Sequence, residues 1–81
     1  MIYRFSFEVL DQNGISEFCQ IQVLAHNILE GIREFVYCLA EWRVESVRDI
    51  RLELNGSTVA CFHGTTGHLS SLTNLGAWKV V

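Results

Sequence analysis

Two segments of alternating apolar residues open the chain, joined by an Asn-Gly turn: IYRFSFEVL at residues 2–10, DQNG at 11–14 and ISEFCQIQVLA at 15–25. A hydrophobic period of two is typical of half-buried strands, so the sequence predicts an antiparallel hairpin here. The alternation of apolar and polar residues also tests the length of the loop, because a slip of one residue in the pairing moves every side chain of a strand to the opposite face.

This test favours the three-residue loop Gln12-Asn13-Gly14 over a two-residue loop. The shorter loop would place Phe7 opposite Gln20, which mixes apolar and polar side chains on the same face. The longer loop pairs apolar residues with one another: Phe7 with Cys19, Phe5 with Ile21 and Tyr3 with Val23. We therefore predict the three-residue turn, with a left-handed glycine and a bulge.

A helix is predicted to follow this hairpin. Asn27-Ile28-Leu29-Glu30 is similar to a capping box in which asparagine replaces the usual serine or threonine. Apolar residues then recur at helical spacing: Ile28, Leu29, Ile32, Phe35, Val36, Leu39 and Ala40. We expect the helix to end at about Trp42 or Arg43. Gly31 weakens it by about 1 kcal/mol relative to alanine and allows a close approach to the sheet.

A second hairpin is predicted around Asn55-Gly56, which is typical of a two-residue type I′ turn. Residues 47–54 alternate before it, with Ile50, Leu52 and Leu54 expected inward, and residues 57–63 follow it. This register places Leu52 opposite Val59 and Ile50 opposite Cys61. Residues 64–67 are expected to form a flexible loop. The spacing of Leu69, Leu72 and Leu75 predicts a short helical turn, and residues 77–81 a possible last strand.

These elements predict a single α+β domain over residues 1–81. Its antiparallel sheet has four or five strands in the chain order β-β-α-β-β, with one main helix on one face. The 81 residues are 49% hydrophobic and 19% charged, without proline, which excludes a disordered or low-complexity chain. One helix covers a strip about 10 Å wide, while the sheet is near 20 Å across. The C-terminal segment is therefore expected to cover part of the inner face.

Charge and cysteine content point to a compartment and exclude some partners. The formal net charge is −3, from nine acidic and six basic residues, which argues against a nucleic-acid partner. Charges lie within the first eight residues and no apolar run is long enough for a membrane span, so we expect neither a signal peptide nor a membrane partner. Three widely spaced cysteines, Cys19, Cys38 and Cys61, are typical of free thiols in a reducing compartment. We expect a cytoplasmic protein.

Cys61, His63 and His68 form the one local cluster of reactive side chains. A metal site needs three or four converging ligands, and these residues lack CxxC or HxxxH spacing. We therefore predict no metal and no other cofactor, and keep the three residues as the candidates for a metal site. Cys19 and Cys61 are expected to face the core, where a thiol is inert. No catalytic residue is assigned; the alternative is a small enzyme or ligand-binding protein that uses this cluster.

Exposed aromatic side chains are the stronger functional signal. Phe18 and Phe62, with Ala60, are expected on the outer face of the sheet, opposite the helix. Trp42 and Trp78 lie at element ends that one helix can hardly cover. Aromatic residues are preferred anchors of interfaces, so Phe18, Phe62, Trp42 and Trp78 are predicted to bind a protein partner or a second copy. The alternative is that residues 69–81 wrap over some of them.

The architecture resembles the small single-domain inhibitors encoded by phages and mobile elements, anti-CRISPR proteins among them. The shared features are a short acidic chain, a leading hairpin, a helix after Val23-Leu24-Ala25 and the Leu54-Asn55-Gly56 hairpin. Proteins of mobile gene cassettes, including integron cassettes, share them as well. The resemblance implies a non-catalytic protein-binding module that occludes a partner's surface, and it carries over no functional residue.

Overall fold

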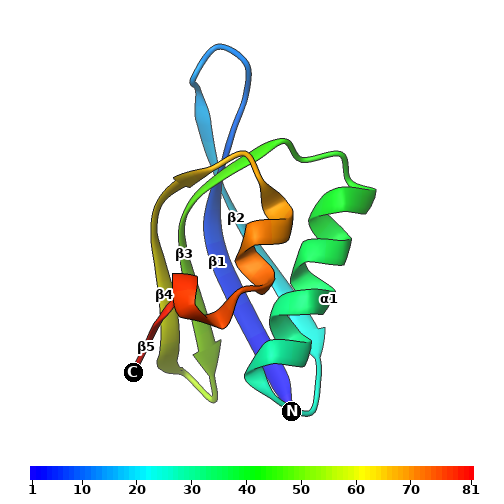
Figure 1. The fold of residues 1–81 in the computed structure, drawn as a ribbon, viewed down its shortest axis with the longest axis vertical. Helices are drawn as coiled ribbons and strands as arrows, with labels where there is room; N and C mark the ends of the chain where they lie inside the picture. The colour runs from blue at the N-terminus through cyan, green and yellow to red at the C-terminus, as the bar shows by residue number, and fades with distance from the viewer.

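A five-stranded antiparallel sheet with one α-helix between its second and third strands forms the fold, which confirms the predicted α+β class (Figure 1). The computed structural model describes all of residues 1–81. The elements are β1 (Ile2–Leu10), β2 (Ser16–Leu24), α1 (Ile28–Glu41), β3 (Ser46–Leu54), β4 (Ser57–Thr66), the 3-10 turns η1 (Leu69–Thr73) and η2 (Leu75–Ala77), and β5 (Lys79–Val80). The strand order in the sheet is β2-β1-β3-β4-β5, so β2 and β5 are the edges.

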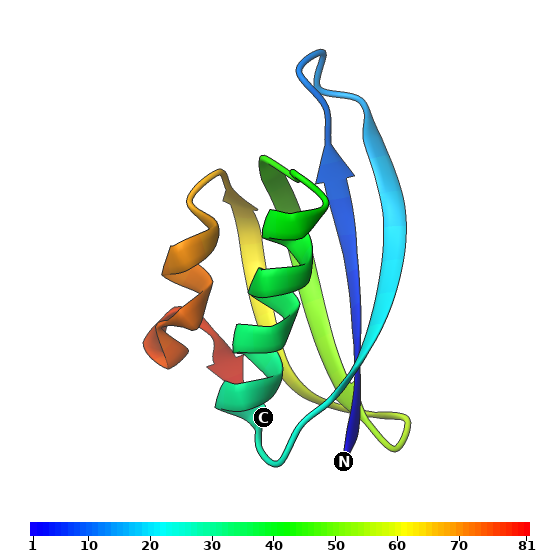
Figure 2. The ribbon, with the colours of Figure 1, turned by 90° about the vertical axis from the view of Figure 1, so that its right-hand side faces the viewer.

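The first hairpin has the predicted loop and register. Its pairs include Phe7 with Cys19, Phe5 with Ile21 and Tyr3 with Val23, without a break from one end to the other. Gly14 has a φ of +79°, a backbone conformation that glycine adopts without steric cost. The Asp11 carboxylate accepts hydrogen bonds from the backbone N–H groups of Asn13 and Ile15, which hold the loop closed. The tip of this hairpin projects beyond the rest of the fold (Figure 2).

Helix α1 begins and ends with hydrogen bonds that its sequence supplies locally. The Asn27 side chain accepts a hydrogen bond of 2.9 Å from the Glu30 N–H, as the predicted cap requires. At the other end Val44 N–H donates to the Leu39 carbonyl, and Arg43 N–H to the Ala40 carbonyl. This pattern is a Schellman motif with Arg43 in its left-handed position, at a φ of +55°.

All helical elements cover one face of the sheet, and the other face is bare (Figure 2). The Phe5 and Phe35 rings stack between sheet and helix with centroids 4.2 Å apart. A Cβ atom at Gly31 would lie 3.2 Å from the Tyr3 ring, so the glycine does allow the expected close approach. Turn η1 covers the rest of the inner face beside α1, and its Leu72 is fully buried. The predicted covering role of the C-terminal segment is confirmed.

The second hairpin has the predicted turn but a different register beyond it. Asn55 and Gly56 both have positive φ, as a type I′ turn requires. A bulge at Val59 then shifts the pairing by one residue, so Leu52 lies opposite Ala60. The predicted pairs of Leu52 with Val59 and Ile50 with Cys61 are therefore wrong.

This bulge reverses the faces that were predicted for the following residues. Ile50 faces the core and lies opposite Phe62, so Phe62 and Ala60 point inward rather than outward. Cys61 lies opposite Arg51 and points outward, which corrects its expected place in the core. Strand β4 also continues to Thr66, across most of the segment predicted to be a loop.

A further bulge interrupts the alternation of β3. Asp49 has a φ of +53° and is the extra residue of β3 relative to β1. As a result, Val47 and Ile50 both face the core although they are three residues apart, and Arg48 and Asp49 lie between them toward solvent. No helix in the structure has the length and apolar character needed to span a membrane.

Candidate functional site

The structure separates the four aromatic residues that were predicted to form a partner-binding surface. Trp78 is 5% exposed, because the C-terminal turns enclose it and its Nε1–H donates to the Leu72 carbonyl at 2.8 Å. The Phe62 ring packs edge-on against Trp78, with centroids 5.9 Å apart. The predicted exposure of these two residues is wrong, and the alternative, in which residues 69–81 cover some of the aromatic side chains, holds for both.

Phe18 and Trp42 are exposed as predicted, but they do not share a surface. Phe18 is 65% exposed and lies opposite Glu8 on the bare face of the sheet. Trp42 is 62% exposed at the end of α1, where it lines a hollow with Val9 on the helical side of the sheet. A partner that covers Phe18 from the bare face therefore does not reach Trp42.

The cluster of Cys61, His63 and His68 is brought together only in part. Cys61 and His63 line a shallow hollow of about 120 Å³ on the bare face, together with Asp49 and Arg51. His68 lies beyond β4, where its N–H donates to the Thr66 hydroxyl, and it does not line this hollow. The structure contains no group of three or more His, Cys, Asp or Glu side chains placed to hold a metal ion.

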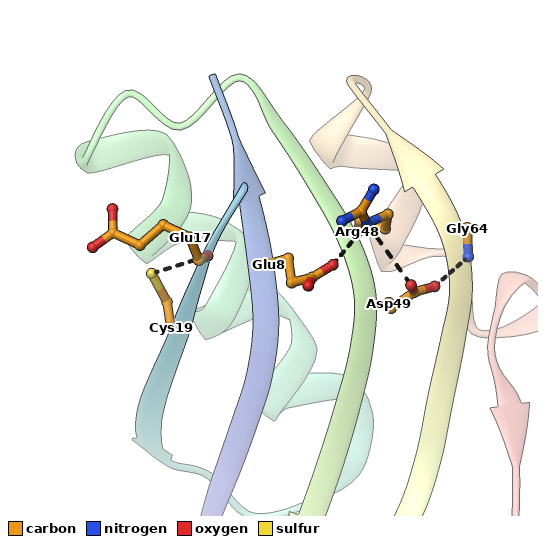
Figure 3. Close-up of polar contacts among 6 residues, drawn as sticks. All are labelled: Glu8, Glu17, Cys19, Arg48, Asp49 and Gly64. Carbon is orange, nitrogen blue, oxygen red and sulfur yellow. Dashed lines mark hydrogen bonds and ion pairs between the residues drawn. The ribbon is translucent and has the colours of Figure 1, made fainter. Parts of the chain in front are cut away.

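Paired charges occupy the bare face beside this hollow (Figure 3). Arg48 Nε donates to Glu8 Oε2 at 2.7 Å, and this hydrogen bond raises the pKa of the guanidinium further. The Asp49 carboxylate lies 3.9 Å from Arg48 and accepts the backbone N–H of Gly64 at 2.9 Å. Because Arg48 is already paired with carboxylates, this part of the bare face has alternating charge rather than a basic patch for a phosphate group.

Two of the three thiols have raised pKa values. Burial raises the pKa of Cys19, and the nearby Glu17 carboxylate raises it further. Burial also raises the pKa of Cys38, with further contributions from Glu34 and Glu41. A raised pKa leaves less of the thiolate, which is the reactive form. Neither thiol has the environment of an activated nucleophile.

Strand β2 combines an open edge with exposed apolar side chains, and the sequence reasoning missed this combination. Ile2, Phe18 and Leu24 are 60%, 65% and 75% exposed on the bare face, and Ile2 lies directly opposite Leu24. Of its nine residues only Glu17 is charged, and none is proline. The pairing of β2 with β1 has no bulge. Natural edges are usually blunted by lysine, proline, bulges or short length, and β2 has none of these features.

The hydrogen-bond pattern identifies which backbone groups of β2 are free. Ala25 and Met1 exchange both backbone hydrogen bonds at 2.9 Å, and Asp11 N–H donates to the Ile15 carbonyl at 3.0 Å. Bonded and non-bonded pairs alternate along an antiparallel ladder, so the odd-numbered residues of β2 bond to β1. The even-numbered residues therefore direct their N–H and C=O groups away from the sheet: Ser16, Phe18, Gln20, Gln22 and Leu24.

The opposite edge of the sheet is different. Strand β5 has two residues, one of them Lys79, and pairs only with Ala60 and Cys61 of β4. A short strand with a lysine protects the part of β4 that it covers, and the pairing of the rest of β4 is interrupted by two bulges. No family model, curated protein or solved structure matches this chain. The candidate site is therefore chosen on geometry, and the β2 edge with its exposed apolar side chains is the part of the surface best suited to bind another chain.

The largest hollow lies at the end of the fold near the N-terminus. It measures about 580 Å³ and has seven lining residues, six of them hydrophobic, including Met1, Ile28 and Leu75. Its one other lining residue is Asn27, whose side-chain oxygen already caps the helix. Substrate sites usually combine an apolar pocket with several convergent polar groups. This hollow is suited to an apolar side chain rather than to chemistry on a substrate.

Proposed function

We propose that this chain is a non-catalytic protein-binding module that adds an extended strand of its partner to the edge of β2. The observation that carries the proposal is the row of unpaired backbone groups at the even-numbered residues of β2, next to the exposed side chains of Phe18 and Leu24. In strand addition, main-chain hydrogen bonds supply affinity, and contacts with alternate side chains supply specificity.

The bare face next to this edge contributes the side-chain part of the interaction. Even-numbered side chains of β2 point to the bare face, where no other element covers them (Figure 2). A strand added beside β2 would place its own alternate side chains next to Phe18 and Leu24 on that face. Apolar residues at those positions of the partner would then remove two exposed side chains from water.

We further propose that this module acts as an inhibitor encoded on a phage or mobile element. It rests on the order of elements and on the acidic, single-domain character of the chain. A module that seals an exposed strand of an enzyme or an assembly blocks it without chemistry of its own. This role needs no cofactor and no catalytic residue.

A capped synthetic peptide with the sequence of residues 15–25 tests strand addition directly. The protein is labelled with ¹⁵N and kept at the lowest concentration that gives an NMR spectrum, and the peptide is titrated into it. We expect saturable shifts of the β2 amides, and slower hydrogen exchange at Phe18, Gln20 and Gln22. Odd-numbered amides of β2 already bond to β1, so their exchange should change much less.

A peptide with proline in place of Gln20 is the matched control. Proline removes one edge hydrogen bond and disfavours further pairing, so this peptide should bind at least tenfold more weakly. Equal binding of both peptides, or shifts confined to residues away from β2, would overturn strand addition as the mode of binding.

A further inference from the structure

We infer that the strand added to β2 is the β2 strand of a second copy, so that two chains share one continuous ten-stranded antiparallel sheet. The inference rests on the proposed strand addition and names its partner; a strand of a target protein would have to compete with the second copy for the same edge. Each copy has one long edge without a bulge at β2, and at the other side of the sheet the two-residue β5 beside the bulged β4. Pairing β2 with β2 removes both long edges and leaves the two short β5 edges outside, which closes the assembly with two-fold symmetry.

Two conditions restrict the register of the two strands: which backbone groups are free to bond, and which face of the sheet each side chain occupies. Opposite residues of an antiparallel pair point to the same face, and the free backbone groups belong to even-numbered residues, so even residues must pair with even residues. Placing the two-fold axis at Gln20 pairs all nine residues of Ser16–Leu24 with their partners. This register forms about ten new main-chain hydrogen bonds, two at each bonded pair. Any other position of the axis forms fewer.

Side chains at this seam are compatible with the same register. Phe18 lies opposite Gln22 of the second copy and diagonal to its Leu24, at a spacing of about 7–8 Å that an aromatic ring can bridge. Both residues are exposed in the single chain. Apolar side chains therefore meet across the axis on the bare face.

Charge does not oppose the pairing. Glu17 is the one charged residue of β2, and it lies opposite Val23 of the second copy rather than opposite its own equivalent. The two Gln20 side chains meet at the axis; each donates from Nε2 to Ser6 Oγ, and its carbonyl oxygen and second amide hydrogen remain for the other copy. The edge is thus complementary to itself in hydrogen bonding, and like charges do not face each other.

Sedimentation of three proteins tests the association: the unaltered chain, Gln20→Pro and Gln20→Ala. The N–H of Gln20 points away from β1, so proline at this position removes no main-chain hydrogen bond of the single chain. The side-chain bond from Gln20 Nε2 to Ser6 Oγ is lost in both variants, so Gln20→Ala controls for it. We expect the unaltered chain and Gln20→Ala to reach twice the monomer mass of 9.2 kDa between micromolar and millimolar concentration. Gln20→Pro should stay folded and monomeric, with a dissociation constant raised at least tenfold.

Cysteine cross-linking tests the register, in a background in which Cys19, Cys38 and Cys61 are replaced by serine. With the axis at Gln20, its Cα atom lies about 5.5 Å from its equivalent, a separation that suits a disulfide. Gln20→Cys should therefore form a covalent dimer on mild oxidation. Gln22→Cys alone should not, whereas a mixture of Gln22→Cys and Phe18→Cys chains should.

Several results would overturn the inference. A monomer at millimolar concentration, or a dimer that survives Gln20→Pro, would exclude a β2–β2 pairing. Self-cross-linking of Phe18→Cys or Gln22→Cys without Gln20→Cys would exclude the assigned axis. If the chain is monomeric while the peptide of residues 15–25 still binds at β2, strand addition stands and only the identity of its partner is wrong.

Discussion

The Asp49 carboxylate accepts a 2.9 Å hydrogen bond from the backbone N–H of Gly64, and both residues have positive φ angles. They lie side by side at the point where β3 and β4 each contain an extra residue (Figure 3). Glycine adopts such a conformation freely, whereas a residue with a Cβ atom adopts it at a cost in energy. The hydrogen bond thus holds two bulges together and maintains the register of the second hairpin.

Replacing Asp49 should therefore destabilise the fold although its side chain is exposed. Asp49→Ala loses the hydrogen bond to Gly64 and places alanine in the left-handed region, so we expect a loss of about 2 kcal/mol in the free energy of unfolding. Asp49→Asn keeps an acceptor oxygen and tolerates the conformation, so its loss should be below about 0.5 kcal/mol. Urea denaturation of both variants measures the difference, and equal losses would contradict this role.

The first hairpin could be predicted from the sequence because nothing interrupts its alternation. Tyr3, Phe5 and Phe7 of β1 lie opposite apolar residues of β2 in one register only, and Gly14 supplies the required turn conformation. The helix start could be predicted for a similar reason, since Asn27 caps α1 within three residues of chain. Both features are decided by neighbours in sequence.

The second hairpin could not be predicted in full because its bulges have a weak local signal. Val59 and Ala60 are both apolar, so the alternation of β4 fits either face. In β3 the signal was present: Val47 and Ile50 are apolar but three residues apart, which a regular strand cannot bury on one face. Reading Arg48 and Asp49 as a bulge would have explained that spacing.

The open edge of β2 depends on contacts between distant parts of the chain. It becomes an edge because β3 pairs with β1 on the other side, and this order does not follow from any local pattern. The predicted exposure of Phe62 was wrong because this residue follows the bulge at Val59 and so points to the opposite face. Long-range pairing thus decided both the open edge that was missed and the inward orientation of Phe62.

Asn27→Ala should lower the free energy of unfolding by about 1 kcal/mol, because it removes the side chain that caps the helix. Asn27→Ser keeps a capping oxygen and is expected to lose at most a few tenths of that amount. Thermal or urea denaturation at equal protein concentration measures both. An unaltered midpoint in Asn27→Ala would place the start of the helix under the control of other groups.

Arg43→Gly should stabilise the protein by about 0.5–1 kcal/mol. Arg43 occupies the left-handed position of the Schellman motif at a φ of +55°, which favours glycine. The hydrogen bonds of this motif are backbone bonds, so they persist in the variant. Arg43→Ala removes the same charge without relieving the conformation and should show no gain. A similar gain in both variants would instead assign the effect to the arginine side chain.

Cys19 and Cys38 should react slowly with iodoacetamide at about pH 8, relative to a cysteine in an unstructured peptide. Their raised pKa values leave little thiolate at this pH. Glu17→Gln should speed the reaction of Cys19 and leave that of Cys38 unaltered, because Glu17 contributes only to the former. Mass spectrometry after timed alkylation gives both rates.

The raised pKa values of Cys19 and Cys38 also make the stability of the fold depend on pH. The native chain keeps these thiol protons to a higher pH than the unfolded chain does, because the pKa is raised in the native state. Stability should therefore fall as the pH rises above the ordinary thiol value. Replacing both cysteines with serine should remove this part of the pH dependence, and an unchanged slope in the double variant would contradict it.

Phe62→Glu and Phe18→Glu should have opposite outcomes, although both place a carboxylate on a strand. Phe62 packs against Trp78, so Phe62→Glu puts a charge beside a buried indole and loses the ring contact. We expect it to lower the free energy of unfolding by more than about 2 kcal/mol. Phe18 is largely exposed in the single chain, so Phe18→Glu should shift the unfolding midpoint little at a concentration where the chain is monomeric. Far-UV circular dichroism during urea denaturation measures both, and a fully stable Phe62→Glu protein would contradict the inward orientation of this ring.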